Sequence, residues 1–223
     1  MKKAVLFDMD GLMFETKLTW QIAEKDFLAH FGKTYDKDIA KRYQGMRVSG
    51  VVAVMIAEYQ LTLTIEQGVH MLTQSIVDNY QRPDLELLPG CKELVKQLYS
   101  SGEYHLAVAS SSPKAAIEAM IHKFNFTEYF DELTSGDEVQ EGKPSPDIFL
   151  ECANRLCISP GNCLVLEDAP NGIEAAKRAG MKAVAVYNRS FYTPEDFKGY
   201  NADLIVASLN DLSLPIIEKV FRP

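Results

Sequence analysis

Short, mostly apolar segments that alternate with helical patterns are the feature that most constrains the fold of this chain. The first is Ala4-Val5-Leu6-Phe7, and from residue 88 onward similar segments recur, each separated from the next by enough residues for a helix. The expected strands cover residues 4–7, 105–109, 163–166, 183–186 and 204–207. Strands that lack polar alternation are covered on both faces, and intervening helices make their pairing parallel. We therefore expect an α/β fold with a Rossmann-like parallel sheet as its core.

The chain between the first two expected strands follows a different pattern. Across residues 16–86 apolar residues recur at helical spacing, and one such stripe runs from Trp20 to Phe31. We find no convincing strand pattern in this stretch. We expect residues 16–86 to form a helical unit inserted into a core made of residues 1–15 and 87–223.

Composition and charge disfavour several classes of function. The 223 residues carry a formal net charge of −8, whereas nucleic-acid binders usually present a basic surface to the phosphates. The four cysteines show neither Cys-x-x-Cys spacing nor histidines at zinc-ligand spacing, so we interpret them as reduced, buried thiols. No run approaches the roughly 20 apolar residues that span a bilayer, and Asp8 and Asp10 interrupt the apolar start. We expect a cytoplasmic protein with neither a nucleic-acid nor a membrane partner.

Two carboxylates directly follow the first expected strand, at the edge where ligands of parallel sheets bind. They are Asp8 and Asp10, and Gly11 follows them. A carboxylate can attack phosphorus when a metal ion neutralises the repulsion between the two anions, and a second carboxylate can transfer protons. The alternative interpretation of this segment is a turn with two capping carboxylates.

A run of serines follows the second expected strand and precedes a helix that begins near Pro113. Ser110, Ser111 and Ser112 place hydroxyl groups beside the free backbone amides of that helix. Such an arrangement can bind a phosphate group. The alternative is an ordinary helix N-cap.

A lysine and an acidic pair come later in the chain. Lys143 stands between a glycine and a proline, and a lysine held in this way offers a positioned cation for phosphoryl oxygens. Glu167 and Asp168 directly follow the expected strand 163–166, and together with Asp8 they can complete a site for a hard cation such as magnesium. The alternatives are an exposed loop lysine and helix-capping acids.

Taken in this order and on these elements, the residues resemble the four motifs of the haloacid dehalogenase-like superfamily. The matching residues are Asp8-Met9-Asp10-Gly11, Ser110, Lys143 and Glu167-Asp168. The similarity covers essentially the whole chain, because residues 16–86 are similar to the inserted helical cap of that family. The most similar subgroup contains β-phosphoglucomutase and small sugar-phosphate and nucleotide phosphatases. The resemblance implies a magnesium-dependent phosphomonoester hydrolase with a helical cap domain, acting on a small phosphorylated metabolite such as a sugar phosphate or nucleotide-like ester.

The resemblance also implies a mechanism. Asp8 would form an aspartyl-phosphate, and Asp10 would protonate the leaving oxygen and then activate the hydrolytic water. Magnesium would be held by Asp8, Asp168, the backbone carbonyl of Asp10 and Glu167, the last directly or through water.

The transferring phosphoryl group would, by the same resemblance, be bound by serine and lysine side chains. Ser110, Ser111 and Lys143 are the expected ligands of its oxygens, and Lys143 also counts among the catalytic residues. An acid at position 10 favours phosphoryl transfer over dehalogenation, because a halide leaves without a proton.

The cap residues leave two chemistries open. Candidates for contact with the substrate are Thr16, Trp20, Gly45, Met46 and Arg47. In β-phosphoglucomutases a histidine stands where this chain has Trp20. An arginine stands there where this chain has Val48, one residue beyond Arg47. Both differences favour hydrolysis over the mutase reaction.

Two further alternatives belong to other classes: a catalytically silent phosphate-binding protein and a response-regulator-like receiver domain. Every motif position carries a competent residue, which disfavours the silent phosphate-binding protein. The presence of another acid, Asp10, beside Asp8 disfavours the receiver domain. The identity of the ester and the oligomeric state are not predicted.

Overall fold

The computed structural model describes residues 2–40, 42, 46–188 and 192–222. Within this part of the chain six strands form one sheet in the order β3-β2-β1-β4-β5-β6, and all pairings are parallel. The strands are β1 (Lys3–Phe7), β2 (Tyr104–Ser110), β3 (Glu132–Ser135), β4 (Cys163–Glu167), β5 (Lys182–Val186) and β6 (Leu204–Val206). The expected α/β fold with a Rossmann-like parallel sheet is confirmed.

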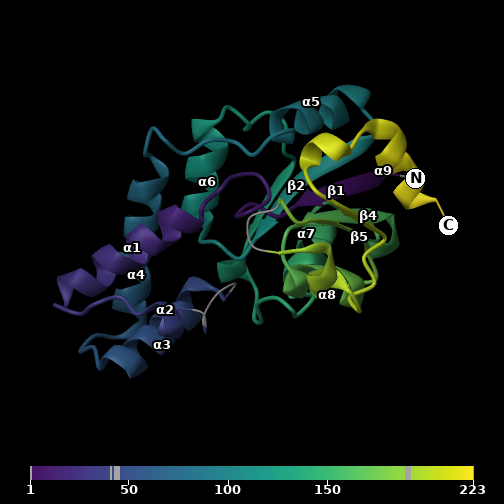
Figure 1. Cartoon of the computed structure of the whole chain (residues 1–223). Coiled ribbons are helices and arrows are strands. Elements are labelled where there is room, and N and C mark those ends of the chain that lie inside the picture. Colours follow the sequence, from purple (N-terminus) through teal and green to yellow (C-terminus); the bar gives the residue numbers. More distant parts are fainter. Residues whose placement is uncertain (1, 41, 43–45, 189–191, 223) are drawn as a thin grey trace.

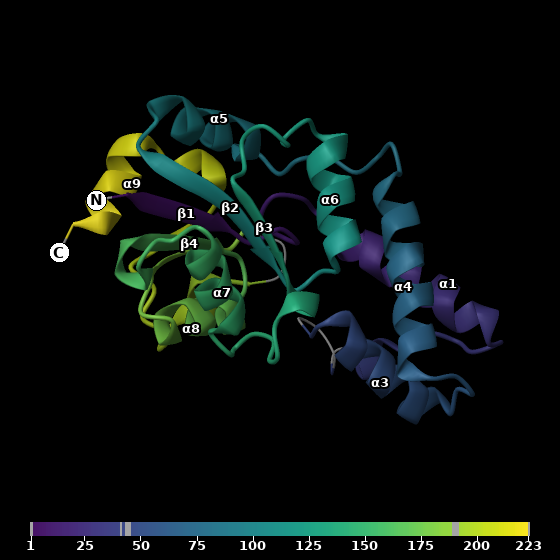
Figure 2. The same ribbon diagram turned by 180° about the vertical axis from the view of Figure 1, so that it is seen from behind.

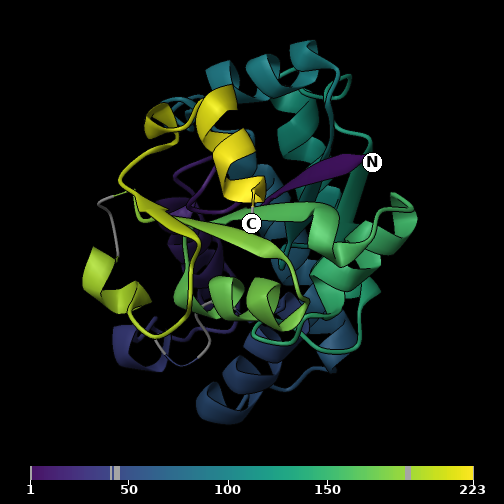
Figure 3. The same cartoon turned by 90° about the vertical axis from the view of Figure 1, so that its right-hand side faces the viewer.

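Helices cover both faces of the sheet, as Figures 1 and 3 show. Alternate residues of β1 point into two separate apolar clusters: Val5 and Phe7 pack with residues of α5, α6 and α9, whereas Ala4 and Leu6 pack with residues of α7 and α8. These helices are α5 (Cys91–Ser101), α6 (Lys114–Lys123), α7 (Asp147–Arg155), α8 (Pro170–Arg178) and α9 (Leu214–Phe221). Burial on both faces explains why the central strand sequences are continuously apolar.

A second group of helices lies beyond the carboxyl ends of the strands, at the left of Figure 1 and the right of Figure 2. It consists of α1 (Lys17–His30), α2 (Lys37–Ala40), α3 (Val48–Tyr59) and α4 (Ile65–Tyr80). Helix α4 packs against α1, α3 and α6, so it connects this group to the helices of the sheet. No strand occurs among the described residues of this stretch, as the helical pattern predicts.

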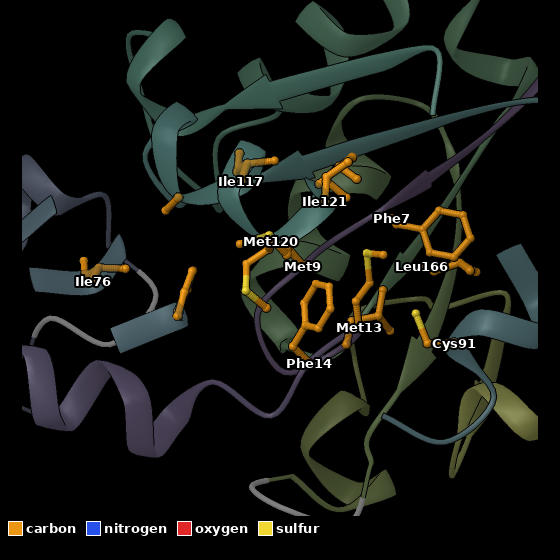
Figure 4. Packing of buried hydrophobic residues seen from close by; sticks show 14 of the residues in the cluster. Phe7, Met9, Met13, Phe14, Ile76, Cys91, Ile117, Met120, Ile121 and Leu166 are labelled. Carbon is orange, nitrogen blue, oxygen red and sulfur yellow. The ribbon is translucent and has the colours of Figure 1, made fainter. Parts of the chain in front are cut away.

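The two chain segments that lead into and out of this helical group are joined to each other. Phe14 and Leu87 form an antiparallel bridge, and the backbone N–H of Leu88 donates to the carbonyl of Met13 at 2.8 Å. Met13 and Phe14 are fully buried beside Met120 of α6 (Figure 4). The entry and exit segments therefore form one fixed connection on the core.

Lys123 of α6 connects that helix to the end of α4 by hydrogen bonds. Its Nζ donates to the backbone carbonyls of Tyr80 at 2.7 Å and Arg82 at 2.5 Å. These carbonyls belong to the last turn of α4 and the segment after it, where helix carbonyls lack intrahelical partners. The lysine supplies both hydrogen bonds and a charge that suits the negative end of the helix.

Two elements have no counterpart among the expected ones. Strand β3 is short and lies at the edge of the sheet, and its first two residues are only partly buried, so its sequence Glu-Leu-Thr-Ser lacks an apolar run. Helix α9 follows the last expected strand. Short 3-10 turns also occur at Gly136–Glu138, Pro160–Asn162, Pro194–Phe197 and Leu209–Asp211. No helix in the described part of the chain combines the length and apolarity that a bilayer crossing requires.

Candidate active site

A cavity of about 800 Å³ lies between the carboxyl ends of the strands and the helices α1 to α3. Its floor is formed by residues at the carboxyl ends of β1, β2 and β4 or directly after them, because parallel strands end at the same edge of the sheet. Most of the residues predicted from the sequence line it: Asp8, Asp10, Thr16, Trp20, Met46, Ser110, Ser111, Lys143, Glu167 and Asp168. Residues 44 and 45 lie outside the described residues, so the prediction for Gly45 has no structural counterpart.

Lys143 stands between two carboxylates at the floor of the cavity. Its Nζ lies 2.5 Å from Asp8 Oδ1 and 2.6 Å from Glu167 Oε2. All three side chains are almost fully buried, so these ion pairs are little screened by water. The loop lysine is therefore a buried member of the site and not an exposed surface residue.

Three carboxylates form a compact acidic cluster in the same place. Asp8, Glu167 and Asp168 each offer an oxygen within 4.8 Å of the other two. With Lys143 as the neighbouring cation, the ionised cluster lacks two positive charges. Such a deficit in a buried site is unfavourable unless the carboxyls bind protons or a divalent cation.

The ionisation of the cluster reflects this deficit. Burial, followed by the charge of Glu167, raises the pKa of Asp8 to about 8 against the lowering effect of Lys143. Burial and the charges of Glu167 and Asp8 raise the pKa of Asp168 well above its ordinary range. Burial alone would lower the pKa of Lys143, but Asp8 and Glu167 raise it above its ordinary value, so the lysine stays charged.

Two glycines make room for the acidic side chains. Gly11 has a φ of +86°, and a Cβ there would lie 2.2 Å from Asp168 Oδ2. A Cβ on Gly172, in the first turn of α8, would lie 2.1 Å from Cδ of Glu167. Both carboxylates therefore rest against backbone that only glycine can provide.

Asp10 makes a different set of contacts from Asp8. Its Oδ1 accepts from the Tyr80 hydroxyl at 2.5 Å and from Trp20 Nε1 at 3.2 Å. Its Oδ2 accepts from Ser112 Oγ at 2.5 Å and from Ser110 Oγ at 3.4 Å. Burial and the neighbouring Asp10 raise the pKa of Tyr80 well above its ordinary value, so this phenol stays protonated. The side chain of Asp10 thus joins the end of β2 to α1 and α4.

The serines at the end of β2 are positioned by their own backbone. Ser110 is the last residue of the strand and is 1% exposed, and its Oγ accepts from the backbone N–H of Ser112 at 3.2 Å. Ser110, Ser111 and Ser112 all line the cavity. The sequence predicts Ser110 and Ser111 as phosphate ligands and Ser112 as their neighbour in the serine run, but it does not predict the hydrogen bond of Ser112 to Asp10.

The cap residues predicted to contact substrate occupy different surroundings. Trp20 and Thr16 line the cavity, and Thr16 is the buried N-cap residue of α1. Met46 lines its mouth and is exposed. Arg47 is not among the lining residues: its Nη1 donates to the carbonyls of Val139 at 2.5 Å and Gly136 at 3.4 Å. The guanidinium of Arg47 thus binds backbone of the sheet domain, next to the loop that carries Lys143.

Apart from Thr16, Trp20 and Met46, the residues that form the wall of the cavity above the floor were not predicted from the sequence. Gln21 and Glu24 lie on the same face of α1, Tyr35 lies in the segment before α2, and Lys37 is the first residue of α2. Glu24 is buried, with 7% of its surface exposed. The burial of Tyr35 and, after it, the charge of Glu24 raise the pKa of Tyr35 above its ordinary range. The sequence signal for Glu24 is its position four residues after Trp20, which places both side chains on the same face of a helix.

The chain matches the family model described as haloacid dehalogenase-like hydrolase over residues 5–186. It is 31% identical over 214 residues to a probable pseudouridine-5'-phosphatase of Drosophila melanogaster, covering 92% of this chain and 89% of that protein. It is 34% identical over 182 residues to the fructose-1-phosphate phosphatase YqaB of Escherichia coli K12, covering 82% and 95%. The fold is that of the β-phosphoglucomutase of Clostridium difficile, with a TM-score of 0.84, 24% identity and coverage of 99% and 97%.

Proposed function

The chain belongs to the haloacid dehalogenase-like hydrolase family and is a phosphatase, and we propose that it hydrolyses a small phosphorylated metabolite through an aspartyl-phosphate on Asp8. One observation carries this proposal. Asp8, Lys143 and the acidic pair at the end of β4 meet at the floor of a cavity, while Asp10 lies on the same floor in a separate set of hydrogen bonds. Two carboxylates in distinct surroundings suit the two roles of nucleophile and proton-transfer group.

The acidic cluster fits a divalent cation that prefers oxygen ligands. Its three carboxylates exceed its one lysine by two charges, which is the charge of Mg²⁺. Asp8, Asp168 and Glu167 would hold the ion by their side chains, the last directly or through water, and Asp10 by its backbone carbonyl. When bound, Mg²⁺ would neutralise the repulsion between the nucleophile and the phosphate ester.

The protein side chains perform the bond changes in two half-reactions. In the first, Oδ of Asp8 forms a bond to phosphorus while the bond to the leaving oxygen breaks, and Asp10 gives that oxygen a proton. In the second, Asp10 takes a proton from water, whose oxygen attacks phosphorus and releases Asp8 and inorganic phosphate. Lys143, already 2.5 Å from Asp8, orients the nucleophile and lowers its pKa against the opposing effects of burial and Glu167.

The transferring phosphoryl group would be bound by Ser110, Ser111 and Lys143. We further propose that residues 16–86 act as a cap domain over a core of residues 1–15 and 87–223, with the two crossings near Thr16 and residues 86–89. A cap in this position would exclude bulk water from the aspartyl-phosphate.

Substrate choice would depend on the cap wall. The wall offers an indole, an amide, a buried carboxylate and a phenol in Trp20, Gln21, Glu24 and Tyr35. These groups suit the hydroxyl groups of a sugar, a polyol or a nucleoside. A mutase of the β-phosphoglucomutase type is the alternative. The contacts of Arg47 disfavour it, because Nη1 is directed at the backbone carbonyls of Val139 and Gly136 and Arg47 is not among the residues that line the cavity.

Release of inorganic phosphate from a panel of phosphorylated sugars, polyols and nucleosides tests the proposal, with Mg²⁺ and with EDTA. Turnover that requires Mg²⁺ and disappears in Asp8→Asn is expected. Interconversion of the two glucose monophosphates faster than phosphate release, in the presence of a glucose bisphosphate, would replace hydrolase by mutase. Binding of phosphate without turnover of any ester would instead support the silent phosphate-binding protein.

A further inference from the structure

Tyr80 is a buried cap residue that reaches the proton-transfer carboxylate of the core. It is the last residue of α4, its side chain is fully buried, and its hydroxyl lies 2.5 Å from Asp10 Oδ1. On sequence alone Tyr80 belongs to the apolar stripe of α4. A phenol that served only packing would not need to face a carboxylate 70 residues away in the chain.

The direction of the hydrogen bonds follows from Trp20. Its Nε1 lies 2.9 Å from the Tyr80 hydroxyl and 3.2 Å from Asp10 Oδ1, and an indole N–H can only donate. Tyr80 therefore accepts from Trp20 and donates to Asp10. Oδ1 of Asp10 is an acceptor for both groups of the cap.

The other oxygen of Asp10 faces groups that can act either way. Oδ2 contacts the hydroxyls of Ser112 at 2.5 Å and Ser110 at 3.4 Å, and a hydroxyl donates or accepts by rotating its hydrogen. Only Oδ2 can therefore carry the mobile proton without displacing a donor. This oxygen also faces Ser110, one of the two serines proposed to bind the phosphoryl group.

The backbone of Tyr80 is held on the core side as well. Lys123 of α6 donates to the carbonyl of Tyr80 at 2.7 Å, so the residue is bound at its main chain and at its side chain. This double attachment fixes where the hydroxyl lies relative to β1 and β2.

We propose that Tyr80, polarised by Trp20, is a positioning residue that holds Asp10 with Oδ2 directed at the leaving-group oxygen. The proposal rests on the proposed function, since it needs Asp10 to transfer a proton. It changes the role expected for Trp20, which here acts through Tyr80 and Asp10 besides contacting substrate. Asp10 stays the catalytic residue.

The test compares two esters of nearly equal shape that differ in their need for a proton. The p-nitrophenolate ion leaves readily without protonation, whereas phenolate is a poorer leaving group. In Tyr80→Phe we expect kcat/KM for phenyl phosphate to fall about 10- to 100-fold and that for p-nitrophenyl phosphate to fall less than about threefold, because general acid catalysis contributes roughly 10²- to 10⁴-fold. Trp20→Phe should change the ratio in the same direction by a smaller factor.

Tyr59→Phe is the matched control. Tyr59 is also a buried tyrosine of the cap, but its hydroxyl accepts from the backbone N–H of Asp36 at 2.9 Å, away from Asp10. We expect the ratio of the two kcat/KM values to stay within about twofold of the wild type, since loss of one hydrogen bond there affects stability and not proton transfer. Asp10→Asn, which removes the proton-transfer group itself, is expected to give the largest change in the ratio of the two kcat/KM values.

The outcomes separate the two proposals. Equal losses on both esters in Tyr80→Phe, or no loss on either, with a folded variant by circular dichroism, overturn the positioning role and leave the phosphatase intact. A wild-type protein that hydrolyses neither ester with Mg²⁺, nor any member of the metabolite panel, overturns the proposed function itself.

Discussion

The floor and the cap wall of the cavity are built in opposite ways. The floor follows from strand pairing: Phe7 pairs with Leu166, and the N–H of Asp8 donates to the carbonyl of Leu166 at 3.0 Å, which brings Asp8 beside the two acids at the end of β4. The wall follows from helix packing, because Trp20, Gln21 and Glu24 face the cavity only where α1 rests against α4. Sheet register fixes chemistry at the floor, whereas the wall depends on side chains that meet through tertiary contacts alone.

Loss of the nucleophile should give the largest effect at the floor. Asp8→Asn keeps the size of the side chain but removes the attacking oxygen charge, so we expect turnover to fall by about 10⁴-fold or more on every ester. Phosphate release assays measure it, with intact mass spectrometry to look for a phosphorylated chain. Residual activity above about 1% of the wild type would contradict a floor that acts through Asp8.

Loss of the buried lysine should act on both rate and stability. Lys143→Met leaves Asp8 and Glu167 without their cation, so we expect kcat to fall about 10²- to 10³-fold. The free energy of unfolding should drop by about 3 to 5 kcal/mol, because breaking a buried ion pair leaves uncompensated charge. Lys177→Met, which removes a more exposed lysine paired with Asp203, is the control and should change kcat by less than twofold. A stable Lys143→Met variant with normal kcat would mean that the pairs are dispensable.

A change in the wall should alter preference and spare the chemistry. Glu24→Gln replaces a buried carboxylate by an amide of similar shape, so kcat/KM for the preferred metabolite should change about tenfold relative to that for p-nitrophenyl phosphate. Kinetics on both esters provide the measure, and Glu58→Gln, an exposed cap residue paired with Arg42, is the control. An equal loss of kcat/KM on both esters would show that Glu24 serves the chemical step, as the floor residues do, and not substrate preference.

The contact between Arg47 and the core should matter less. Arg47→Met removes hydrogen bonds to the carbonyls of Val139 and Gly136, and we expect KM to rise about threefold and stability to fall by about 1 kcal/mol. Arg42→Met, which affects only an exposed ion pair with Glu58, should leave KM unchanged. Loss of most of kcat in Arg47→Met would show that the guanidinium serves the chemical step.

The smallest expected effect is a dependence of stability on pH without metal. The pKa of Asp8 is raised to about 8 in the folded protein, so between about pH 4 and 8 the folded state holds a proton that the unfolded chain has lost. The free energy of unfolding should therefore fall as pH rises through this range in EDTA, lowering the Tm by a few degrees. Mg²⁺ should raise the Tm more at pH 8 than at pH 5, because the cation needs the ionised carboxylate. A Tm in EDTA that rises over the same range would refute this.

The same contrast explains how far the sequence could be read. The parallel sheet and the floor residues are predictable because apolar runs end directly on Asp8, Ser110 and Glu167, and each run marks its own strand. Strand β3 escapes prediction because an edge strand of four residues needs no apolar run. The hydroxyl of Tyr80 is hidden by its place on an apolar stripe, and its partner lies 70 residues away. Arg47 can be predicted as a cation near the substrate, but its hydrogen bond to Val139 depends on how α3 lies against the core, which the sequence does not show.

The bridge between Phe14 and Leu87 has a consequence for engineering. Because the insert leaves and re-enters the core through two adjacent, hydrogen-bonded segments, the distance to be spanned there does not depend on what is inserted. Residues 16–86, which we propose as the cap domain, would then be an exchangeable module: the cap of another phosphatase could be grafted at the same two points without altering the sheet. Chimeras made at this junction would carry specificity as a transferable part, and a graft that retains Trp20 and Tyr80 beside Asp10 would also retain the phosphoryl chemistry.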